Sequence, residues 1–194
     1  MKITCVLGSP RTNGNSATLT RYMLQQFERR GANVQAFEIN KLDYRGCQGC
    51  MACKTTLEKC ALRDDITPIL EQVKNSDVLI VASGVYYGNV TSQAKAFLDR
   101  IYSFYVPEFY LKDESQRSRL TPGKKLIFVL TQGNSDESLY ADIYPSYERL
   151  IRIHGFQQNY QLRACGISSP ADLQARPELF AQADAIVNDI CGAA

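Results

Sequence analysis

Residues 78–83 read V-L-I-V-A-S, a short apolar run without a charged residue. A strand that is covered by helices on both faces of a parallel sheet has this composition, whereas a half-exposed strand alternates apolar and polar residues. The stretch therefore predicts a central strand of a parallel sheet. Similar runs at residues 2–7 and 125–131 predict two further strands, and weaker runs at 33–39 and 159–165 predict two more.

Helical patterns separate these five predicted strands. Apolar residues at helical spacing predict helices over about 15–30, 64–74, 94–105, a segment that ends near 154, and 177–190. The first helix is expected to have Asn15 or Ser16 as its N-cap. This alternation indicates a three-layer α/β/α sandwich with a parallel sheet. Five strands in fewer than 200 residues favour the flavodoxin-like strand order 2-1-3-4-5.

The composition is that of an ordinary globular protein. The chain has 194 residues, 45% of them apolar, and we expect one domain over residues 1–194 with a cysteine-rich loop insertion at about 43–63. A net charge of +2 gives no field that would attract nucleic acid or an anionic membrane. No apolar run is long enough to span a bilayer, and the N-terminus does not read as a signal peptide. We therefore expect a cytoplasmic protein.

In the predicted strand order, ligands bind at the carboxyl ends of the first and third strands. The loop G-S-P-R-T-N-G-N-S at 8–16 leaves a strand and opens a helix, so its amides and Arg11 suit a phosphate. The loop S-G-V-Y-Y-G-N-V-T at 83–91 offers two tyrosines that could flank a planar ring, and T-Q-G-N at 131–134 adds polar groups. Each loop alone could be an ordinary turn. Together they predict a mononucleotide site, and the fold favours FMN.

These segments resemble those of a known family. G-S-P-R-T-N-G-N-S at 8–16 resembles the phosphate loop of the NADPH-dependent FMN reductases. V-Y-Y-G-N-V-T-S-Q-A-K-A-F-L-D-R at 85–100 resembles another segment of the same family, which has a Pro-x-Tyr and a small-residue turn before Lys and Asp-Arg. This chain has Gly84 where the family commonly has proline. The cysteine run before Asp64 and Asp65 resembles the iron–sulfur flavoprotein branch of the same superfamily. The resemblance covers most of residues 1–135, whereas the remainder matches only in its strand–helix pattern.

The resemblance implies a flavodoxin-like FMN oxidoreductase that forms a homodimer or homotetramer. Carried over by position, the FMN-binding residues are Ser9, Arg11, Asn13, Gly14, Asn15, Ser16, Val85, Tyr86, Tyr87, Gly88, Asn89, Thr131, Gln132 and Gly133. The implied reaction is hydride transfer from NAD(P)H to the flavin, followed by reduction of flavin, quinone or a similar small acceptor. Because the flavin carries this chemistry, no side chain is assigned as a catalytic acid, base or nucleophile.

Four of the seven cysteines lie in C-Q-G-C-M-A-C-K-T-T-L-E-K-C, residues 47–60. The spacing C-x2-C-x2-C-x6-C can bring four thiolates around one [4Fe–4S] cluster, and the resemblance to iron–sulfur flavoproteins agrees with Cys47, Cys50, Cys53 and Cys60 as its ligands. Free thiols, a redox disulfide, or zinc or another metal remain alternatives.

The sequence is therefore compatible with three functions. The first is an FMN-dependent NAD(P)H oxidoreductase. The second is an iron–sulfur flavoprotein electron carrier that uses FMN together with a [4Fe–4S] cluster. The third is a non-enzymatic FMN-binding module that reports redox state to a partner.

Overall fold

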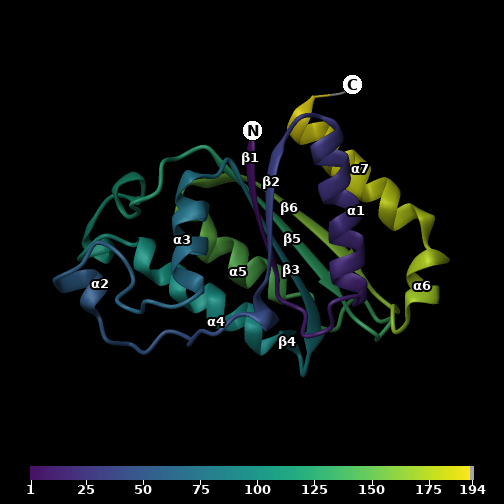
Figure 1. Cartoon of the computed structure of the whole chain (residues 1–194), viewed down its shortest axis with the longest axis horizontal. Coiled ribbons are helices and arrows are strands. Elements are labelled where there is room, and N and C mark those ends of the chain that lie inside the picture. The colour runs from purple at the N-terminus through teal and green to yellow at the C-terminus, as the bar shows by residue number, and fades with distance from the viewer. Residues whose placement is uncertain (193–194) are drawn as a thin grey trace.

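The structure is a computed structural model, and it describes residues 1–192. A parallel sheet of five strands in the order β2-β1-β3-β5-β6 forms its centre, and the two-residue strand β4 pairs with β3 (Figure 1). The predicted fold class and strand order are confirmed, and β4 is the one addition to the predicted sheet. The strands are β1 (Lys2–Leu7), β2 (Asn33–Glu38), β3 (Val78–Tyr86), β4 (Asn89–Val90), β5 (Lys124–Thr131) and β6 (Phe156–Ala164).

Helices cover both faces of this sheet. Helices α1 and α7 pack together on one face, and α3, α4 and α5 lie on the other (Figure 1). The short helix α2 stands far from the sheet, at the end of a long excursion of the chain. The helices are α1 (Asn15–Arg29), α2 (Ala52–Thr55), α3 (Ile66–Asn75), α4 (Ser92–Arg100), α5 (Ile143–Arg152), α6 (Pro170–Gln174) and α7 (Pro177–Cys191). In the described part of the chain, no helix has both the length and the apolar character needed to cross a bilayer.

Strand β3 shows why the apolar run decides the fold. Its side chains alternate between the two faces, so that Ile80 joins the core beneath α1 and α7, while Leu79 and Val81 join the core beneath α3 and α4. All three are at most 1% exposed. Burial of each such side chain contributes about 1.5–3 kcal/mol. A strand with two buried faces therefore needs the unbroken apolar sequence that is seen.

Most predicted boundaries differ from the structure by one to three residues, and three of the differences bear on the site. Helix α1 begins after Gly14, which is its N-cap, and neither Asn15 nor Ser16 caps it. The stripe predicted as one helix over 94–105 breaks after Arg100 into a 3₁₀ turn, Ile101–Phe104. Apolar spacing alone does not separate these two kinds of helix. Strand β3 also runs three residues beyond the predicted end, because its last residues pair with β4.

The turn between β3 and β4 has the geometry of a tight hairpin. Tyr87 and Gly88 have φ values of 47° and 78°, and two successive positive values match the type I′ turn that joins two strands closely. Tyr87 is fully exposed at its tip. The Y-Y-G-N sequence thus forms the turn of a hairpin, within the segment 83–91 that was predicted as a loop.

Candidate functional site

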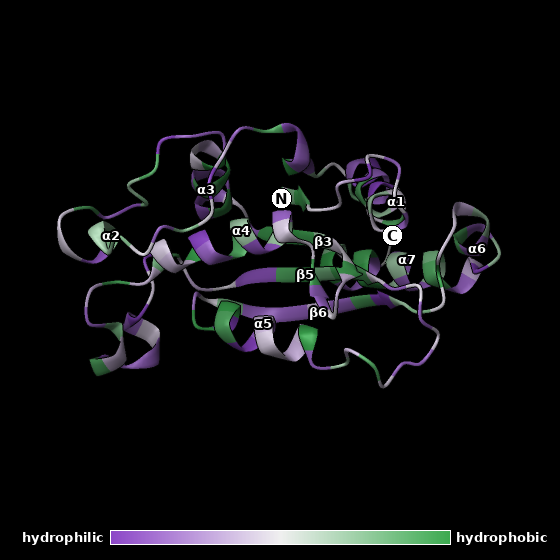
Figure 2. Ribbon diagram, turned by 90° about the horizontal axis from the view of Figure 1, so that it is seen from below, coloured by the Kyte–Doolittle hydropathy of each residue, from purple (hydrophilic) through white to green (hydrophobic). Residues whose placement is uncertain are grey.

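The carboxyl ends of β1, β3 and β5 meet at one edge of the sheet. The register pairs Leu7 with Ala82, and Gly84 with Thr131, so the three following loops start side by side. Figure 2 looks onto this edge and shows α1 on one side of it and α4 on the other. The structure therefore brings together the three loops on which the sequence-based prediction rests.

A cavity of about 250 Å³, here called the edge cavity, lies between these loops. Its predicted lining residues are Ser9, Arg11, Gly14, Asn15, Ser16, Val85, Tyr86, Thr131 and Gly133, and it is also lined by Gly84, Ile167 and Ser168. The other five predicted residues, Asn13, Tyr87, Gly88, Asn89 and Gln132, do not line it.

One end of the edge cavity can bind an anion. The first backbone N–H groups of a helix have no partner within the helix, and no side chain caps α1 in the described residues. Ser9, Ser16 and the Arg11 guanidinium line the same space. Gly14 is needed here, because a Cβ at this position would lie 2.9 Å from Ser9 Oγ. A phosphate would find backbone donors, hydroxyls and a positive charge together.

Tyr86 forms a wall of the edge cavity. Its hydroxyl accepts a hydrogen bond from Arg11 Nε at 3.2 Å, and the guanidinium carbon lies 6.0 Å from the ring centre. The ring also packs on Gly84, where a Cβ would lie 2.9 Å from Tyr86 Cε1. Glycine at position 84, in place of the proline common in the resembled family, gives this tyrosine the space that it occupies.

Gln132 and Asn89 have structural partners away from the edge cavity. The Gln132 amide donates to the carbonyls of Asn134 and Asp136 at 3.0 and 3.1 Å, and it accepts from Arg163 at 2.7 Å. Asn89 Oδ1 accepts from its neighbour's backbone amide and from the Tyr147 hydroxyl. Their side chains organise the loops in which they lie.

Sequence reasoning missed Ile167 and Ser168, which follow β6 and complete the edge cavity. A Cβ at Gly133 would lie 2.9 Å from Ser168 Oγ, so the two loops are in close contact. The available signal was Ser169 with Asp172, which form a capping box at the start of α6. It marks the end of a loop beside β5, and therefore beside the site.

A second cavity, of about 130 Å³, lies in the cysteine-rich excursion and is here called the cysteine cavity. Cys47, Cys50, Cys53 and Cys60 all line it, together with Arg100 and Tyr102. All seven cysteines are free thiols in the described residues. Within residues 1–192, no group of three or more His, Cys, Asp or Glu side chains is close enough to hold a metal ion. The four thiols thus surround a space without converging on one point.

Positive charge lies beside this cavity. Lys54 Nζ is 3.5 Å from Cys53 Sγ and donates to the carbonyls of Tyr102 and Tyr105, at 2.8 Å each. Burial lowers the pKa of Lys54, although the Cys53 thiol opposes this effect. Arg119 donates to the Cys53 carbonyl at 3.1 Å. An anionic group in the cysteine cavity would therefore be electrostatically favoured.

Sequence comparisons find relatives that are named iron–sulfur flavoproteins. An iron–sulfur flavoprotein of Archaeoglobus fulgidus is 40% identical over 101 residues, which cover 52% of this chain and 46% of the relative. An iron–sulfur flavoprotein of Methanosarcina thermophila is 33% identical over 114 residues, 59% of each chain. The chain spans about half the length of the curated relatives it matches.

The fold has a similar solved counterpart in the NAD(P)H:quinone oxidoreductase of Methanothermobacter marburgensis. The two structures align with a TM-score of 0.75 over 98% of this chain and 96% of the other, at 14% identity, so this likeness concerns the fold alone. The sequence model of the NADPH-dependent FMN reductases matches residues 1–143, which include β1 to β5 and most of the edge cavity. This chain belongs to the NADPH-dependent FMN reductase family.

Proposed function

We propose that this chain binds FMN in the edge cavity and oxidises NAD(P)H to reduce flavin, quinone or a similar small acceptor. The observation that carries the proposal is the joint placement of Arg11 and the uncapped start of α1 on the edge cavity. These groups suit a phosphate monoester, and Tyr86 on another wall suits a planar ring.

The residues of the cavity fit FMN in position and in chemistry. Ser9, Ser16 and Arg11 would hold the phosphate with the α1 amides, and Tyr86 would flank the ring system. Gly133 and Ser168 are in close contact on the cavity wall, so a larger side chain at position 133 would not fit there. When bound, FMN supplies the hydride acceptor and the one- or two-electron transfer. The protein's contribution is orientation, charge and exclusion of water.

The test is a fluorescence titration with FMN and riboflavin, followed by NADPH and NADH oxidation assays with quinone and free flavin as acceptors. We expect saturable FMN binding, weaker riboflavin binding, and steady NAD(P)H oxidation. Protein that binds neither flavin would overturn the proposal. FMN binding without turnover with any acceptor would instead support the non-enzymatic redox module.

The cysteine cavity favours a second candidate function, an iron–sulfur flavoprotein electron carrier that uses FMN with a [4Fe–4S] cluster. Each thiolate of such a cluster binds a different iron, so the ligands surround a volume and need not meet at one atom. Cys47, Cys50, Cys53 and Cys60 all line the cysteine cavity, and Lys54 and Arg119 would offset the negative charge of a cluster. Two relatives that carry the name iron–sulfur flavoprotein add support.

Anaerobic purification with iron, sulfide and flavin assays tests this second candidate. We expect about four irons per chain and a broad absorbance near 400 nm, beyond the flavin bands. Protein that contains neither iron nor sulfide after anaerobic preparation, and takes up neither on reconstitution, would refute the cluster but leave the FMN proposal standing.

We further propose that residues 1–194 form one domain with a cysteine-rich insertion at about 43–63, assembled as a homodimer or homotetramer in the cytoplasm. Free thiols suit a reducing compartment. Exposed Tyr87, Tyr110 and Leu111 are large apolar side chains that a subunit contact would cover. Light scattering that gives the mass of a single chain would contradict the assembly.

A further inference from the structure

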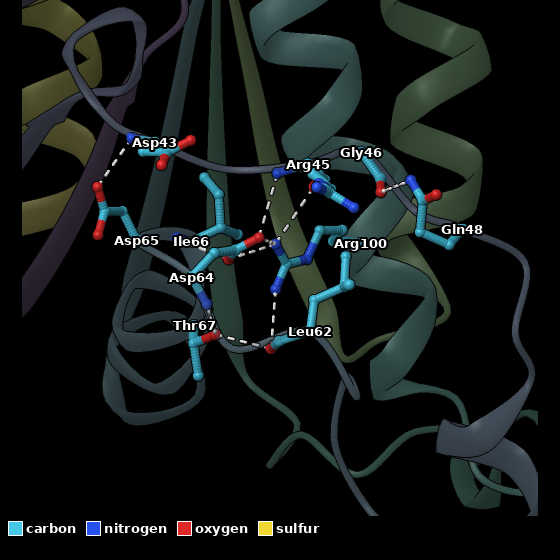
Figure 3. A network of polar contacts seen from close by, with 10 residues as sticks. All are labelled: Asp43, Arg45, Gly46, Gln48, Leu62, Asp64, Asp65, Ile66, Thr67 and Arg100. Atoms are coloured by element: carbon cyan, nitrogen blue, oxygen red, sulfur yellow. Dashed lines mark hydrogen bonds and ion pairs between the residues drawn. The ribbon is translucent and has the colours of Figure 1, made fainter.

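The chain enters and leaves the cysteine-rich excursion through a narrow neck. Residues 43–45 and 62–65 lie side by side at its base, and residues 46–61, here called the cysteine loop, extend beyond it (Figure 3). The Asp43 amide donates to the Asp65 carboxylate at 2.8 Å, and the Asp65 amide donates back to the Asp43 carbonyl at 3.2 Å. The Arg45 amide donates to the Asp64 carboxylate at 3.1 Å.

Arg100, the last residue of α4, joins the two sides of this neck. Its Nη1 donates to both carboxylate oxygens of Asp64 at 2.6 Å and to the Arg45 carbonyl at 3.3 Å. Its Nη2 makes a long contact of 3.5 Å with the Leu62 carbonyl. One guanidinium thus contacts the residues before the cysteine loop and those after it (Figure 3).

The burial of this pair requires that its charges be matched. The Arg100 side chain is 0% exposed and the Asp64 side chain 16% exposed. Burial raises the pKa of the Asp64 carboxyl, but hydrogen bonds from Arg100 and from the Arg45 amide outweigh burial and hold the pKa below its usual value. Asp64 is therefore a carboxylate, and the neck is closed by a buried ion pair.

One donor of Arg100 is left over. Its Nε is buried and has no hydrogen-bond partner within residues 1–192. Arg100 also lines the cysteine cavity, beside the four thiols. The Arg100 side chain is 0% exposed, so this donor lies behind the wall of the cavity, and Arg100 acts on the four thiols through the position of the neck.

We propose that Arg100 is a positioning residue for an iron–sulfur cluster in the cysteine cavity: it holds the neck of the cysteine loop closed and so keeps the four cysteines around the cluster. This inference rests on the cluster-containing form of the proposed function. Arginine suits the role because its planar fork reaches several acceptors at once, which a lysine ammonium on a flexible stem cannot do. Partners of this kind behind the ligands tune metal affinity as well as orientation.

The same helix supplies a matched control. Lys95 and Asp99 form an ion pair on α4, with side chains 47% and 44% exposed, and Asp99 also lines the cysteine cavity. An exposed pair of this kind contributes little to stability. The variant Lys95→Gln therefore removes a charge from α4 without touching the neck, whereas Arg100→Gln removes the charge that closes it.

The experiment compares wild type, Arg100→Gln, Arg100→Lys, Asp64→Asn and Lys95→Gln after anaerobic purification. Iron retention against a chelator, the reduction potential of the iron–sulfur centre, and FMN affinity are measured on each. We expect Arg100→Gln to lose iron at least about tenfold faster than wild type, and Arg100→Lys to recover part of the loss. Lys95→Gln should remain within about twofold of wild type, and FMN affinity should stay unchanged because the edge cavity contains neither Arg100 nor Asp64.

The potentials separate positioning from a general loss of structure. Arg100→Gln removes a positive charge beside the cluster and should lower the potential, whereas Asp64→Asn leaves that charge uncompensated and should raise it. If Arg100→Gln does not fold, the doubly substituted Arg100→Gln/Asp64→Asn chain, which buries no unpaired charge, gives the same retention measurement.

Arg100 variants that match Lys95→Gln in iron retention would overturn the inference and leave the cluster standing, because Lys95→Gln changes the charge at the cavity without touching the neck. Wild-type protein without iron or sulfide would overturn the cluster and the inference together, and the FMN titration would then show whether the edge cavity retains its proposed function.

Discussion

Thr91 connects β3 to the loop that follows β1 beside the edge cavity. Its hydroxyl can be removed with little change in the shape of the side chain. It is the N-cap of α4, where its Oγ1 accepts from the Ala94 amide at 3.2 Å and donates to the Gly8 carbonyl at 2.6 Å. Its own amide donates to Ser83 Oγ at 2.9 Å. The side chain is fully buried, so water cannot replace these partners.

The substitution Thr91→Val keeps the branched shape and removes the hydroxyl. Loss of the N-cap costs about 1 kcal/mol, and a buried Gly8 carbonyl that loses its donor costs a further ~1–3 kcal/mol. The free energy of unfolding should therefore fall by about 2–4 kcal/mol. For a chain of this size each kcal/mol lowers Tm by about 2–4 °C, which gives a decrease of about 4–16 °C. FMN binding should weaken as well, because Gly8 leads into the loop at 9–16.

Urea unfolding followed by circular dichroism measures the change, and calorimetry gives Tm. Thr91→Ser keeps the hydroxyl and should recover most of the loss. Thr18→Val, on the exposed side of α1, makes the same chemical change and should remain within about 0.5 kcal/mol of wild type. A Thr91→Val protein that is less than 1 kcal/mol below wild type would refute the reasoning, because the hydroxyl would then not join β1, β3 and α4.

Three further predictions concern the two cavities and the dependence of stability on pH under acidic conditions. Arg11→Gln should weaken FMN binding by about 10- to 100-fold, which corresponds to the loss of one or two charge-assisted hydrogen bonds. Its affinity for riboflavin, measured by titration, should stay near that of wild type. Equal losses for both ligands would place the phosphate elsewhere. Cys50→Ala should remove iron and the absorbance near 400 nm but spare FMN, whereas Cys191→Ala, an exposed thiol outside the cysteine cavity, should spare both. Burial, helped by the charge of Lys54, lowers the pKa of His154 to about 3. The unfolded chain then binds one more proton than the folded chain between about pH 3 and 6.5, so stability falls as the pH drops through this window. Unfolding of His154→Gln should depend less on pH there, and identical pH profiles would contradict the assigned shift.

The fold was readable from sequence where burial alone determines the residue type. The apolar run of β3 has to be covered on both faces, and the alternation with helices then restricts the sheet to a few topologies. Polar residues at the strand ends were also informative, because the carboxyl ends of parallel strands lie at the same edge of the sheet. Arg11 and Thr131 were therefore predicted to lie together, and both line the edge cavity although they are 120 positions apart in the sequence.

The features of the site that were not predicted depend on tertiary contacts, which no local sequence pattern reveals. Gln132 looked like a flavin contact because of its place in T-Q-G-N, yet its amide is used by the loop carbonyls and by Arg163. The hairpin at Tyr87 required a tyrosine at positive φ, which residue preference argues against. Ile167 reaches the edge cavity only because β6 lies beside β5, a neighbour relation set by the whole sheet.

Helix α4 is anchored at both of its ends by buried side chains. Thr91 fixes its start to the strands beneath the edge cavity, and Arg100 fixes its last turn to the neck of the cysteine loop. Nine residues at 1.5 Å each separate these anchors by about 14 Å along the helix axis. Lys95 and Asp99 lie between them and pair with each other, and Asp99 also lines the cysteine cavity. Both cavities therefore depend on one rigid helix, so their relative position is set by its two buried ends and not by the exposed charges between them.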